Sequence, residues 1–230
     1  MELGRNMKDK SLANNSYLTI QTLQRMPYYL QYLKKAKAEG RTDVSASAIA
    51  AELQLNDVLV RKDIAAVSST GGRPKAGFNV CTLIRDIEQY MGYHTTKETV
   101  LVGAGSLGKA LLRNREFDMY GLKIVAAFDV RRSLIHKKIN GVEVYSLAKL
   151  KNFCLRQNIQ IGIITVPAEA AQDVANRLVD GGIQAIWNFA FVKLQVPDHV
   201  LVQNEDLASS LAMLSQHLRL ANEMGESWIE

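Results

Sequence analysis

The sequence predicts an α/β fold, in which a small helical domain precedes a doubly wound parallel sheet and a single helix follows it. Two observations from about residue 98 onward favour the sheet. Apolar, β-branched runs alternate there with helical patterns, and a glycine-rich segment at 103–108 separates the first run from the first helical pattern. Alternation of this kind is typical of parallel strands joined by crossover helices.

The glycine-rich segment carries the most informative motif of the chain. It follows an expected strand at 99–102 and opens an expected helix at 107–114, which is the context that a G-x-G-x-x-G motif needs. There the glycines permit a tight turn, a close approach of backbone amides to a pyrophosphate, and close packing of helix on strand. The motif therefore predicts a dinucleotide site in a Rossmann-type sheet, and a sheet that binds nothing is the alternative. The residues that form it are Gly103, Ala104, Gly105, Ser106, Leu107 and Gly108.

An acidic residue follows the motif at the spacing that a dinucleotide site requires. The apolar run 123–128 ends at Asp129, which lies 21 positions (129 minus 108) after Gly108. A carboxylate about 20 residues beyond the glycines accepts a hydrogen bond from the adenosine ribose, which favours NAD. Arg131 and Arg132 follow directly, and these two cations are the alternative, since they could accept the 2′-phosphate of NADP.

The remaining strands and helices continue the alternation. We expect an edge strand at 142–145, a central strand at 161–166, further strands at 185–189 and 199–203, and helices at 146–157 and 168–181. Ligands of such sheets bind beyond the carboxyl ends of the strands. The other residues expected at those ends are Thr165, Val166, Pro167, Asn188, Phe189 and Ala190.

The first 80 residues have the helical patterns of a small domain. An apolar stripe with roughly helical spacing runs over 16–39. Pro27 lies inside this stripe, so we expect either a break there or a helix that begins near Met26. A later helical pattern at 82–91 is expected to connect this domain to the sheet.

Two short helical patterns around a turn at 54–56 indicate a helix-turn-helix. Asn56 or Asp57 can cap the second helix, whose inward positions are Val60, Ile64 and Val67. In this motif the second helix enters the major groove of DNA. A plain helical hairpin is the alternative.

A glycine-rich turn at 68–77 follows and carries two cations, as the wing of a winged helix does. Wings contact phosphates or the minor groove. A flexible basic linker is the alternative for this segment. From helix and wing together, the residues expected to contact DNA are Asn56, Leu59, Arg61, Lys62, Arg73 and Lys75.

The charge distribution supports a polyanion as the partner of the first domain. Residues 1–80 hold 12 Lys and Arg against 7 Asp and Glu, whereas residues 81–230 hold 16 of each. The whole net charge of +5 therefore lies in the first 80 residues, although chance asymmetry of a solvated surface is the alternative.

The composition excludes several classes of protein. No apolar run is long enough for a membrane helix, and the first residues have no apolar signal core, so we expect a cytoplasmic protein that makes no use of a membrane. Cys81 and Cys154 have no metal or redox spacing, so we expect free, buried thiols and no metal.

A last amphipathic pattern at 206–222 predicts a helix with a long apolar stripe. Such a stripe packs on its own domain or is exchanged into a second subunit. The expected division of the chain is a mobile tail at 1–16, a winged-helix domain at 17–80, a connecting helix and linker at 81–97, a Rossmann-type domain at 98–204 and a C-terminal dimerisation helix at 205–230.

This order of parts, with several segments, resembles the Rex family of bacterial redox-sensing transcriptional repressors. The likeness covers about residues 20–215, and its most specific stretches are TVPAEAAQ and AAFDV. The segments that carry it are 25–33 (RMPYYLQYL), 60–63 (VRKD), 77–78 (GF), 102–108 (VGAGSLG), 124–130 (IVAAFDV), 165–172 (TVPAEAAQ), 188–190 (NFA) and 206–207 (DL).

The resemblance implies a homodimer with exchanged C-terminal helices that binds double-stranded operator DNA and holds NAD(H) in each Rossmann-type domain. A high NADH/NAD ratio then closes the dimer and releases the operator. The resemblance also places Asp206 in a network linked to the cofactor, and it implies no catalytic residue and no enzymatic activity.

Two members of that network are replaced in this chain. Gln31 stands where well-known members have arginine, and Asn114 stands where they have tyrosine, so only Asp206 is kept. A Rex-like regulator with lost or retuned NADH sensing is therefore the second hypothesis. An NAD(P)-dependent oxidoreductase is the third, and it is disfavoured because the four histidines are scattered and no Lys, His or Tyr constellation marks a proton donor.

Overall fold

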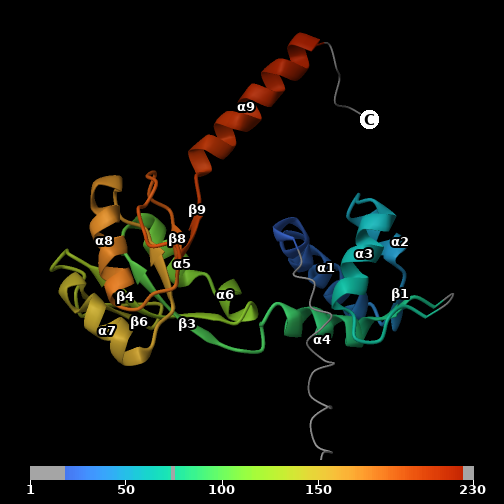
Figure 1. Cartoon of the computed structure of the whole chain (residues 1–230), viewed down its shortest axis with the longest axis horizontal. Coiled ribbons are helices and arrows are strands. Elements are labelled where there is room, and N and C mark those ends of the chain that lie inside the picture. Colours follow the sequence, from blue (N-terminus) through green and yellow to red (C-terminus); the bar gives the residue numbers. More distant parts are fainter. Residues whose placement is uncertain (1–18, 74–75, 225–230) are drawn as a thin grey trace, which may run out of the picture. The chain divides into compact units, whose positions relative to one another are not determined.

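The computed structural model describes residues 19–73 and 76–224 (Figure 1). They form two compact units, one that ends at His94 and one that begins at Thr95. The expected mobile tail at 1–16 and the wing residue Lys75 lie outside the described residues.

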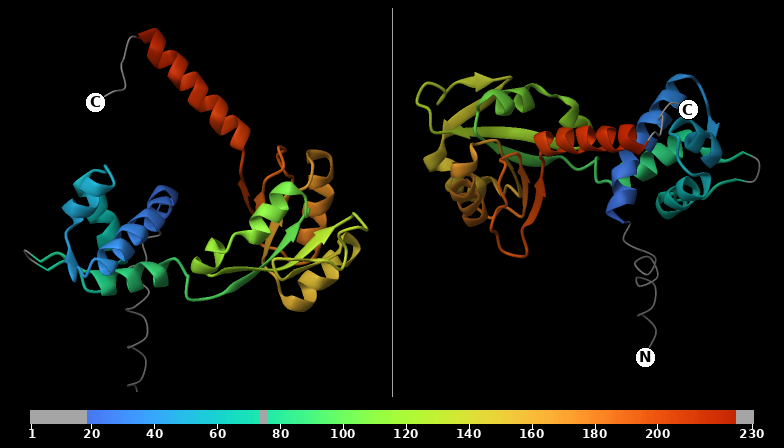
Figure 2. Two further views of the ribbon diagram at one scale, coloured as in Figure 1. Left: turned by 180° about the vertical axis from the view of Figure 1, so that it is seen from behind. Right: turned by 90° about the horizontal axis from the view of Figure 1, so that it is seen from above.

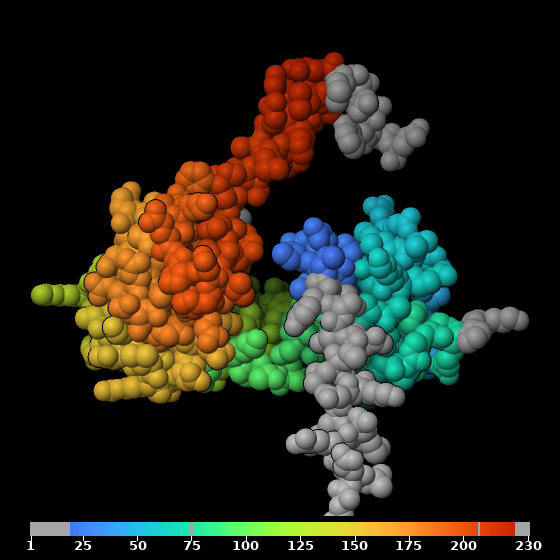
Figure 3. Space-filling model, viewed as in Figure 1, coloured from blue at the N-terminus to red at the C-terminus, as the bar shows by residue number. Residues whose placement is uncertain are grey.

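The N-terminal unit is a winged helix, as predicted. Its elements are α1 (Ile20–Ala38), β1 (Asp43–Val44), α2 (Ala46–Glu52), α3 (Asp57–Val67), β2 (Phe78–Asn79) and α4 (Val80–Tyr90). Helices α2 and α3 form the helix-turn-helix, and β1 pairs antiparallel with β2 at the base of the wing. The helices share one core and make the compact body coloured blue to teal in Figure 3. The inward positions predicted for α3 are confirmed, since Val60 and Ile64 are fully buried and Val67 packs against the same core.

Helix α1 is continuous through Pro27, so the expected break or late start is wrong. Proline removes one backbone hydrogen bond from a helix. Here that loss is offset by burial, because Met26, Tyr29 and Leu33 are completely buried on both sides of the proline. The side chain of Thr19 also caps the first turn, by accepting a hydrogen bond from the amide of Thr22.

Helix α4 belongs to the core of the N-terminal unit and is not the separate connector expected at 81–97. Leu83 and Ile87 are at most 1% exposed and lie in the same apolar cluster as α1. The burial follows from a strongly one-sided apolar face, which α1 covers. Cys81 lies on the opposite face and is exposed, which corrects the expectation of a buried thiol, whereas Cys154 is buried as expected.

The C-terminal unit contains one seven-stranded sheet, which confirms the predicted α/β class. The strand order is β5-β6-β4-β3-β7-β8-β9, and all pairs except β5–β6 are parallel. The strands are β3 (Lys97–Val102), β4 (Leu122–Asp129), β5 (Lys138–Ile139), β6 (Val142–Ser146), β7 (Ile161–Ile164), β8 (Ala185–Asn188) and β9 (Leu201–Asn204).

Helices cover both faces of this sheet, as Figure 2 shows. The residues of β3 alternate between two cores, so Val100 and Val102 face one core while Leu101 faces the other. Helices α7 (Leu150–Gln157) and α8 (Ala168–Asp180) pack on the first face. Helix α5 (Ser106–Arg113) packs on the second face through Leu112. Strand β3 lies at the centre, where the order of strands reverses between β4 and β7.

Three local features differ from expectation. The strand at 142–146 is not the edge of the sheet, because the two-residue strand β5 forms an antiparallel hairpin outside it. A short helix, α6 (Glu116–Met119), follows α5. A 3₁₀ turn at Leu147–Lys149 precedes α7, which therefore begins four residues later than expected. All three lie in short connections, where sequence periodicity carries little information.

The last element of the described residues is helix α9 (Leu207–Met224), which confirms the helix predicted at 206–222. Large apolar side chains of its described residues are exposed, including Leu211 (68%), Leu214 (66%) and Leu218 (61%). These three positions recur at helical spacing and form one stripe. Among the residues that the structure describes, no helix is both long and apolar enough to cross a membrane.

Candidate functional site

A cleft of about 600 Å³ opens beyond the carboxyl ends of β3, β4 and β7. It lies where the strand order reverses, which is the place where open α/β sheets bind ligands. Its volume is within the range of cofactor pockets. Of the predicted residues, those that line it are Gly103, Gly105, Leu107, Asp129, Thr165, Val166, Pro167 and Phe189.

The glycine turn has the geometry that the motif predicted. Gly103 has φ +102°, which side chains rarely tolerate, and a Cβ there would meet the carbonyl oxygen of Thr165 at 2.7 Å. A Cβ on Gly108 would meet the carbonyl oxygen of Gly103 at 2.0 Å, so this glycine permits the close approach of α5 to the turn. A Cβ on Gly105 would meet no protein atom within 4 Å. Gly105 therefore leaves open space at the cleft instead of packing against the fold.

The N-terminus of α5 faces this open space without a side-chain cap. Gly105 is the N-cap residue and has no side chain with which to bond the first-turn amides. The amides of Ser106 and Leu107 have no acceptor within their own helix, because the first turn of any helix lacks such partners. Free amides and the positive dipole end together suit a phosphate group.

Thr165 fixes the turn to the neighbouring strand. Its hydroxyl shares its hydrogen between two carbonyl oxygens, that of Gly103 at 2.7 Å and that of Val102 at 3.1 Å. Its backbone amide donates to Val102 as well, at 2.9 Å. Pro167 then begins α8 as its N-cap residue. The segment TVPAEAAQ thus joins the central strand to a helix at the edge of the cleft.

Asp129 ends β4 at the cleft with its side chain 5% exposed. Its carboxylate accepts hydrogen bonds from the amides of Ala104 and Arg131, both at 2.8 Å. The guanidinium of Arg131 donates two more, from Nη2 at 2.7 Å and from Nε at 3.0 Å. Burial raises the pKa of Asp129, but the bonds from Arg131 and Ala104 outweigh that effect and hold the pKa below its ordinary value. The carboxylate is therefore ionised at neutral pH.

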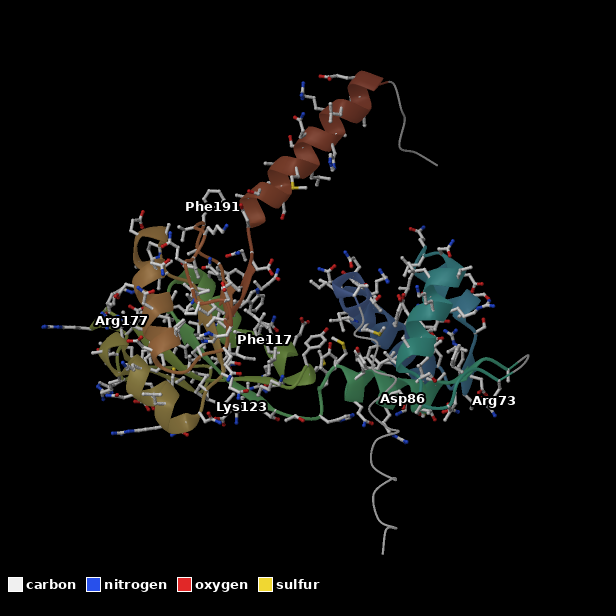
Figure 4. All side chains as sticks on the ribbon, in the orientation of Figure 1. Arg73, Asp86, Phe117, Lys123, Arg177 and Phe191 are labelled. Carbon is white, nitrogen blue, oxygen red and sulfur yellow. The ribbon has the colours of Figure 1, made fainter. Side chains whose placement is uncertain are left out.

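Asn188 is the last residue of β8, and Phe189 and Ala190 follow it, but only Phe189 of the three lines the cleft. The amide of Asn188 is completely buried and holds the following loop, because its Nδ2 donates to the carbonyls of Ala190 and Val192. Phe189 packs on Trp187, with ring centroids 4.5 Å apart. Phe191 projects from this loop and is 76% exposed (Figure 4).

The remaining predicted cofactor residues do not line the cleft. Ala104 is buried and contributes its amide to Asp129, whereas Ser106 lies on the exposed side of the α5 terminus. Asp206 stands directly before α9, and its carboxylate accepts a hydrogen bond from the amide of Ser209 at 2.8 Å. Asn114 ends α5 and accepts a bond from the amide of Glu116. These contacts are local and structural.

Several cleft residues escaped the sequence analysis. Leu147, Ala170 and Val174 lie in segments whose apolar residues look like ordinary core residues. No signal in the sequence distinguishes these three from residues that only pack in the core. Arg131 was singled out only as an alternative, and the structure brings it into the lining, bonded to Asp129. Arg132 is exposed and lies outside the lining.

Helix α3 presents a continuous exposed face in the N-terminal unit. Val58, Arg61, Lys62 and Ala65 are exposed and follow the spacing of one helix face. Asn56 caps the helix by accepting hydrogen bonds from the amides of Val58 and Leu59, so its side chain already has partners. Val58 is 71% exposed but is not among the predicted DNA contacts, whereas Leu59 is among them and is half-buried.

The two cations of this face differ in their surroundings. Arg61 forms an ion pair with Asp57 at 2.7 Å, one turn earlier on the same helix. No ion pair is recorded for Lys62 within the described part of the chain. In the wing, Arg73 bonds the carboxylate of Asp43 on β1. Both the backbone amide and the hydroxyl of Ser69 donate to the carboxylate of Asp86 on α4.

A buried ion pair holds α3 to α1. Asp63 on α3 is 4% exposed, and its carboxylate accepts bonds from Nε of Arg25 at 2.7 Å and from the hydroxyl of Tyr29 at 2.8 Å. Thr22 donates a further bond at 3.2 Å. Burial raises the pKa of Asp63, but the hydrogen bonds from Arg25 and Tyr29 lower it by more, so the pKa lies below its ordinary value. These contacts fix how α3 projects from its unit.

Within the described ranges, no group of three or more His, Cys, Asp or Glu side chains is placed to hold a metal. The cleft lining contains only two ionisable side chains, Asp129 and Arg131. Asp129 is ionised and accepts hydrogen bonds, and Arg131 donates to it as a cation.

The two units match different family models. Residues 94–192 match the family described as a CoA binding domain, and residues 19–65 match the family described as "putative DNA-binding protein N-terminus". The first model covers the glycine turn and the cleft. The second covers the helix-turn-helix through Ala65.

Curated relatives match over nearly the full chain. The redox-sensing transcriptional repressor Rex of Treponema denticola is 42% identical over 84% of this chain and 91% of its own. The protein of the same name from Porphyromonas gingivalis is 36% identical over 91% of this chain and 98% of its own.

Solved structures of Rex-family proteins agree in fold as well. The crystal structure of RSP in complex with β-NAD⁺ and operator DNA is 30% identical, with a TM-score of 0.83, and the match covers 91% of this chain and 96% of that one. The crystal structure of RSP in complex with β-NADH has a TM-score of 0.79 at the same identity, covering 92% of this chain and 99% of that one. This chain belongs to the Rex family of redox-sensing transcriptional repressors.

Proposed function

We propose that this chain is a transcriptional repressor that binds operator DNA through α3 and the wing, and that NADH binding in the cleft weakens its hold on DNA. The observation that carries the proposal is the presence of both parts in one chain. In one unit the exposed face of α3 carries Arg61 and Lys62. In the other unit a glycine turn lies beside an acidic ribose partner, Asp129. Such a protein acts in the cytoplasm, where operator DNA and the dinucleotide pool meet.

The residues of the cleft fit a nicotinamide dinucleotide. The open space at Gly105 and the free amides at the start of α5 suit its pyrophosphate. Asp129 lies where the adenosine ribose is bound in such sheets. The cofactor supplies a redox state that differs between NADH and NAD, and the chain needs only to bind these two forms unequally.

On the DNA side, the exposed face of α3 offers both kinds of contact that recognition requires. Arg61 and Lys62 supply positive charge for phosphates or guanine edges, and Val58 and Ala65 supply apolar contacts of the kind made to thymine methyl groups. The wing adds Arg73, with Asn56, Leu59 and Lys75 as the remaining candidates.

We further propose that the partner of α9 is a second copy of the chain. Its stripe of Leu211, Leu214 and Leu218 is exposed in a single chain, which costs free energy unless another surface covers it. A homodimer with exchanged helices buries the stripe and gives two recognition helices for a two-fold symmetric operator. A double variant, Leu211→Glu with Leu214→Glu, is expected to sediment as a monomer.

Control by NADH requires unequal affinity for two arrangements of the dimer. A ligand shifts such an equilibrium only by the difference between its affinities for the two states. NADH must therefore bind the arrangement that releases DNA more tightly than the one that holds it. No bond chemistry is required of any side chain, and the proposed protein is a regulator and not an enzyme.

Calorimetric titration with NADH and separately with NAD tests the dinucleotide role, and binding to selected operator DNA with and without each tests the regulation. We expect tighter binding of NADH and release of DNA by it. A Gly105→Val variant should lose dinucleotide binding without loss of thermal stability, because its side chain enters open space. Lys109→Ala, in the same helix but outside the lining, is the control. Failure of the wild type to bind either dinucleotide would overturn the proposal.

A second candidate is a regulator that no longer distinguishes NADH from NAD. Gln31 is exposed on α1 and carries no charge, and Asn114 is occupied by its bond to the Glu116 amide. Neither can reproduce a charged or stacking contact. Equal affinities for NADH and NAD, with DNA binding intact, would favour this candidate.

A further inference from the structure

The carboxylate of Asp129 has no free acceptor position for a ribose hydroxyl. An ionised carboxylate offers about four lone-pair sites. Four donors already occupy them in this chain, namely the amides of Ala104 and Arg131 and two nitrogens of the Arg131 guanidinium. A 2′-hydroxyl that donates to Asp129 must therefore displace one of these donors.

The four donors differ in how readily they can be exchanged. The amide of Ala104 belongs to the glycine turn and that of Arg131 to the segment directly after β4, so neither can move without the backbone. The guanidinium of Arg131 is on a flexible side chain that is 51% exposed, and it lines the cleft. Of the groups around Asp129, the guanidinium of Arg131 is therefore the one that a bound ribose contacts or displaces.

The charge of the subsite changes with this arrangement. A lone carboxylate repels a ribose 2′-phosphate, and this repulsion is the basis of discrimination in favour of NAD. Here the charge of Asp129 is neutralised by a bidentate pair with Arg131. The guanidinium uses only Nε and one N–H of Nη2 on Asp129, so its three other N–H groups can bind a phosphate while the pair that neutralises Asp129 is kept.

We propose that Arg131 makes this cleft a site for NADP(H) as well as NAD(H), with the guanidinium as the 2′-phosphate subsite. The proposal rests on the proposed function, in that the cleft must bind a nicotinamide dinucleotide at all. It adds the class of dinucleotide that the cleft admits and the residue that decides it.

The test compares the dissociation constants of NADH and NADPH by calorimetry in the full-length protein. The wild type should bind both, with NADPH no more than about tenfold weaker than NADH. In Arg131→Ala the ratio of the NADPH constant to the NADH constant should rise by about tenfold to a hundredfold, the loss expected for charge-assisted hydrogen bonds. Arg131→Lys, which keeps the charge but not the fork, should give an intermediate ratio.

Arg132→Ala is the matched control, because it removes the same charge from an exposed neighbour that neither lines the cleft nor bonds Asp129. It should leave the ratio unchanged. Equal changes in the two alanine variants, or a wild type that prefers NADH by more than a hundredfold, would overturn the proposal while leaving NADH binding established. A wild type that binds neither dinucleotide would overturn the proposed function as well.

Discussion

Each unit of the molecule buries one aspartate that is paired bidentately with an arginine, and the two pairs differ in what surrounds the arginine. At Asp63 the donors come from α1, 34 to 41 residues earlier in the chain, and the Arg25 side chain is 20% exposed. At Asp129 the arginine is two residues away and 51% exposed at the mouth of a cleft. The first pair joins two helices, whereas the second is local and open to exchange with a ligand. Burial of a carboxylate alone therefore does not show whether the residue is structural or binds a ligand. The exposure of the paired arginine, and its distance along the chain, distinguish the two cases.

The largest effect should come from breaking the pair that joins α1 and α3. Asp63→Ala leaves Arg25 and Tyr29 without their common acceptor, and removal of one partner of a buried pair costs about 3 to 5 kcal/mol. Native-state hydrogen exchange of α1 and α3 amides measures this loss unit by unit. The control is Glu52→Ala, because an ion pair as exposed as that of Glu52 with Lys35 contributes little to stability. Equal losses in the two variants would contradict the structural role of Asp63.

The same cluster should make the N-terminal unit sensitive to alkali. Burial, aided by the hydrogen bond to Asp63, raises the pKa of Tyr29 from 10.0 to about 12. Because the folded state favours the protonated phenol, this contribution is fully present below pH 10 and is lost as the pH rises toward 12. Tyr29→Phe should remove this part of the pH dependence. The measurement is hydrogen exchange of α1 and α3 amides as a function of pH, with amides of β3 and β4 as the reference. If Tyr29→Phe leaves the pH dependence of stability unchanged, Tyr29 is not the group that causes it.

A smaller loss should follow removal of the carboxylate at the cleft. Asp129→Ala leaves the amide of Ala104 without its acceptor, whereas the half-exposed Arg131 can be hydrated instead. We expect about 1 kcal/mol, the scale of one hydrogen bond, in chemical unfolding followed by tryptophan fluorescence. Arg132→Ala should not change stability. A loss as large as that of Asp63→Ala would mean that the two pairs are equally structural.

Much of the fold could be predicted because strong local signals agreed with the final packing. The glycine turn, the alternation of strands and helices and the inward face of α3 each depend on residues close in sequence. The continuity of α1 could not be predicted, because Pro27 is tolerated only through burial of side chains against α4 and through the bonds to Asp63. Such contacts join residues that are far apart in the chain.

The site was predicted where chemistry is tied to backbone geometry and missed where it depends on side-chain partners. Gly103, Gly105 and Asp129 follow from a motif and a spacing. The pairing of Arg131 with Asp129 has no periodic signal, since two adjacent arginines look alike in sequence and only one of them turns toward the carboxylate. Asp63 was missed for the same reason, because a charged residue on an amphipathic helix reads as solvent-exposed.

The smallest expected effect tests the same idea on the exposed face of α3. There Arg61 is paired with Asp57, and its neighbour Lys62 has no ion pair with any residue that the structure describes. Each phosphate contact that is lost lowers the slope of the logarithm of operator affinity against the logarithm of salt concentration by about 1. Lys62→Ala should give this full reduction, because Lys62 is exposed and has no recorded ion pair within the described ranges. Arg61→Ala should give less, since Arg61 must leave Asp57 to reach a phosphate. Lys35→Ala is the control, because Lys35 lies on α1 and is paired with Glu52 of α2, and it should leave the slope unchanged. An unchanged slope in all three variants would mean that α3 does not contact DNA.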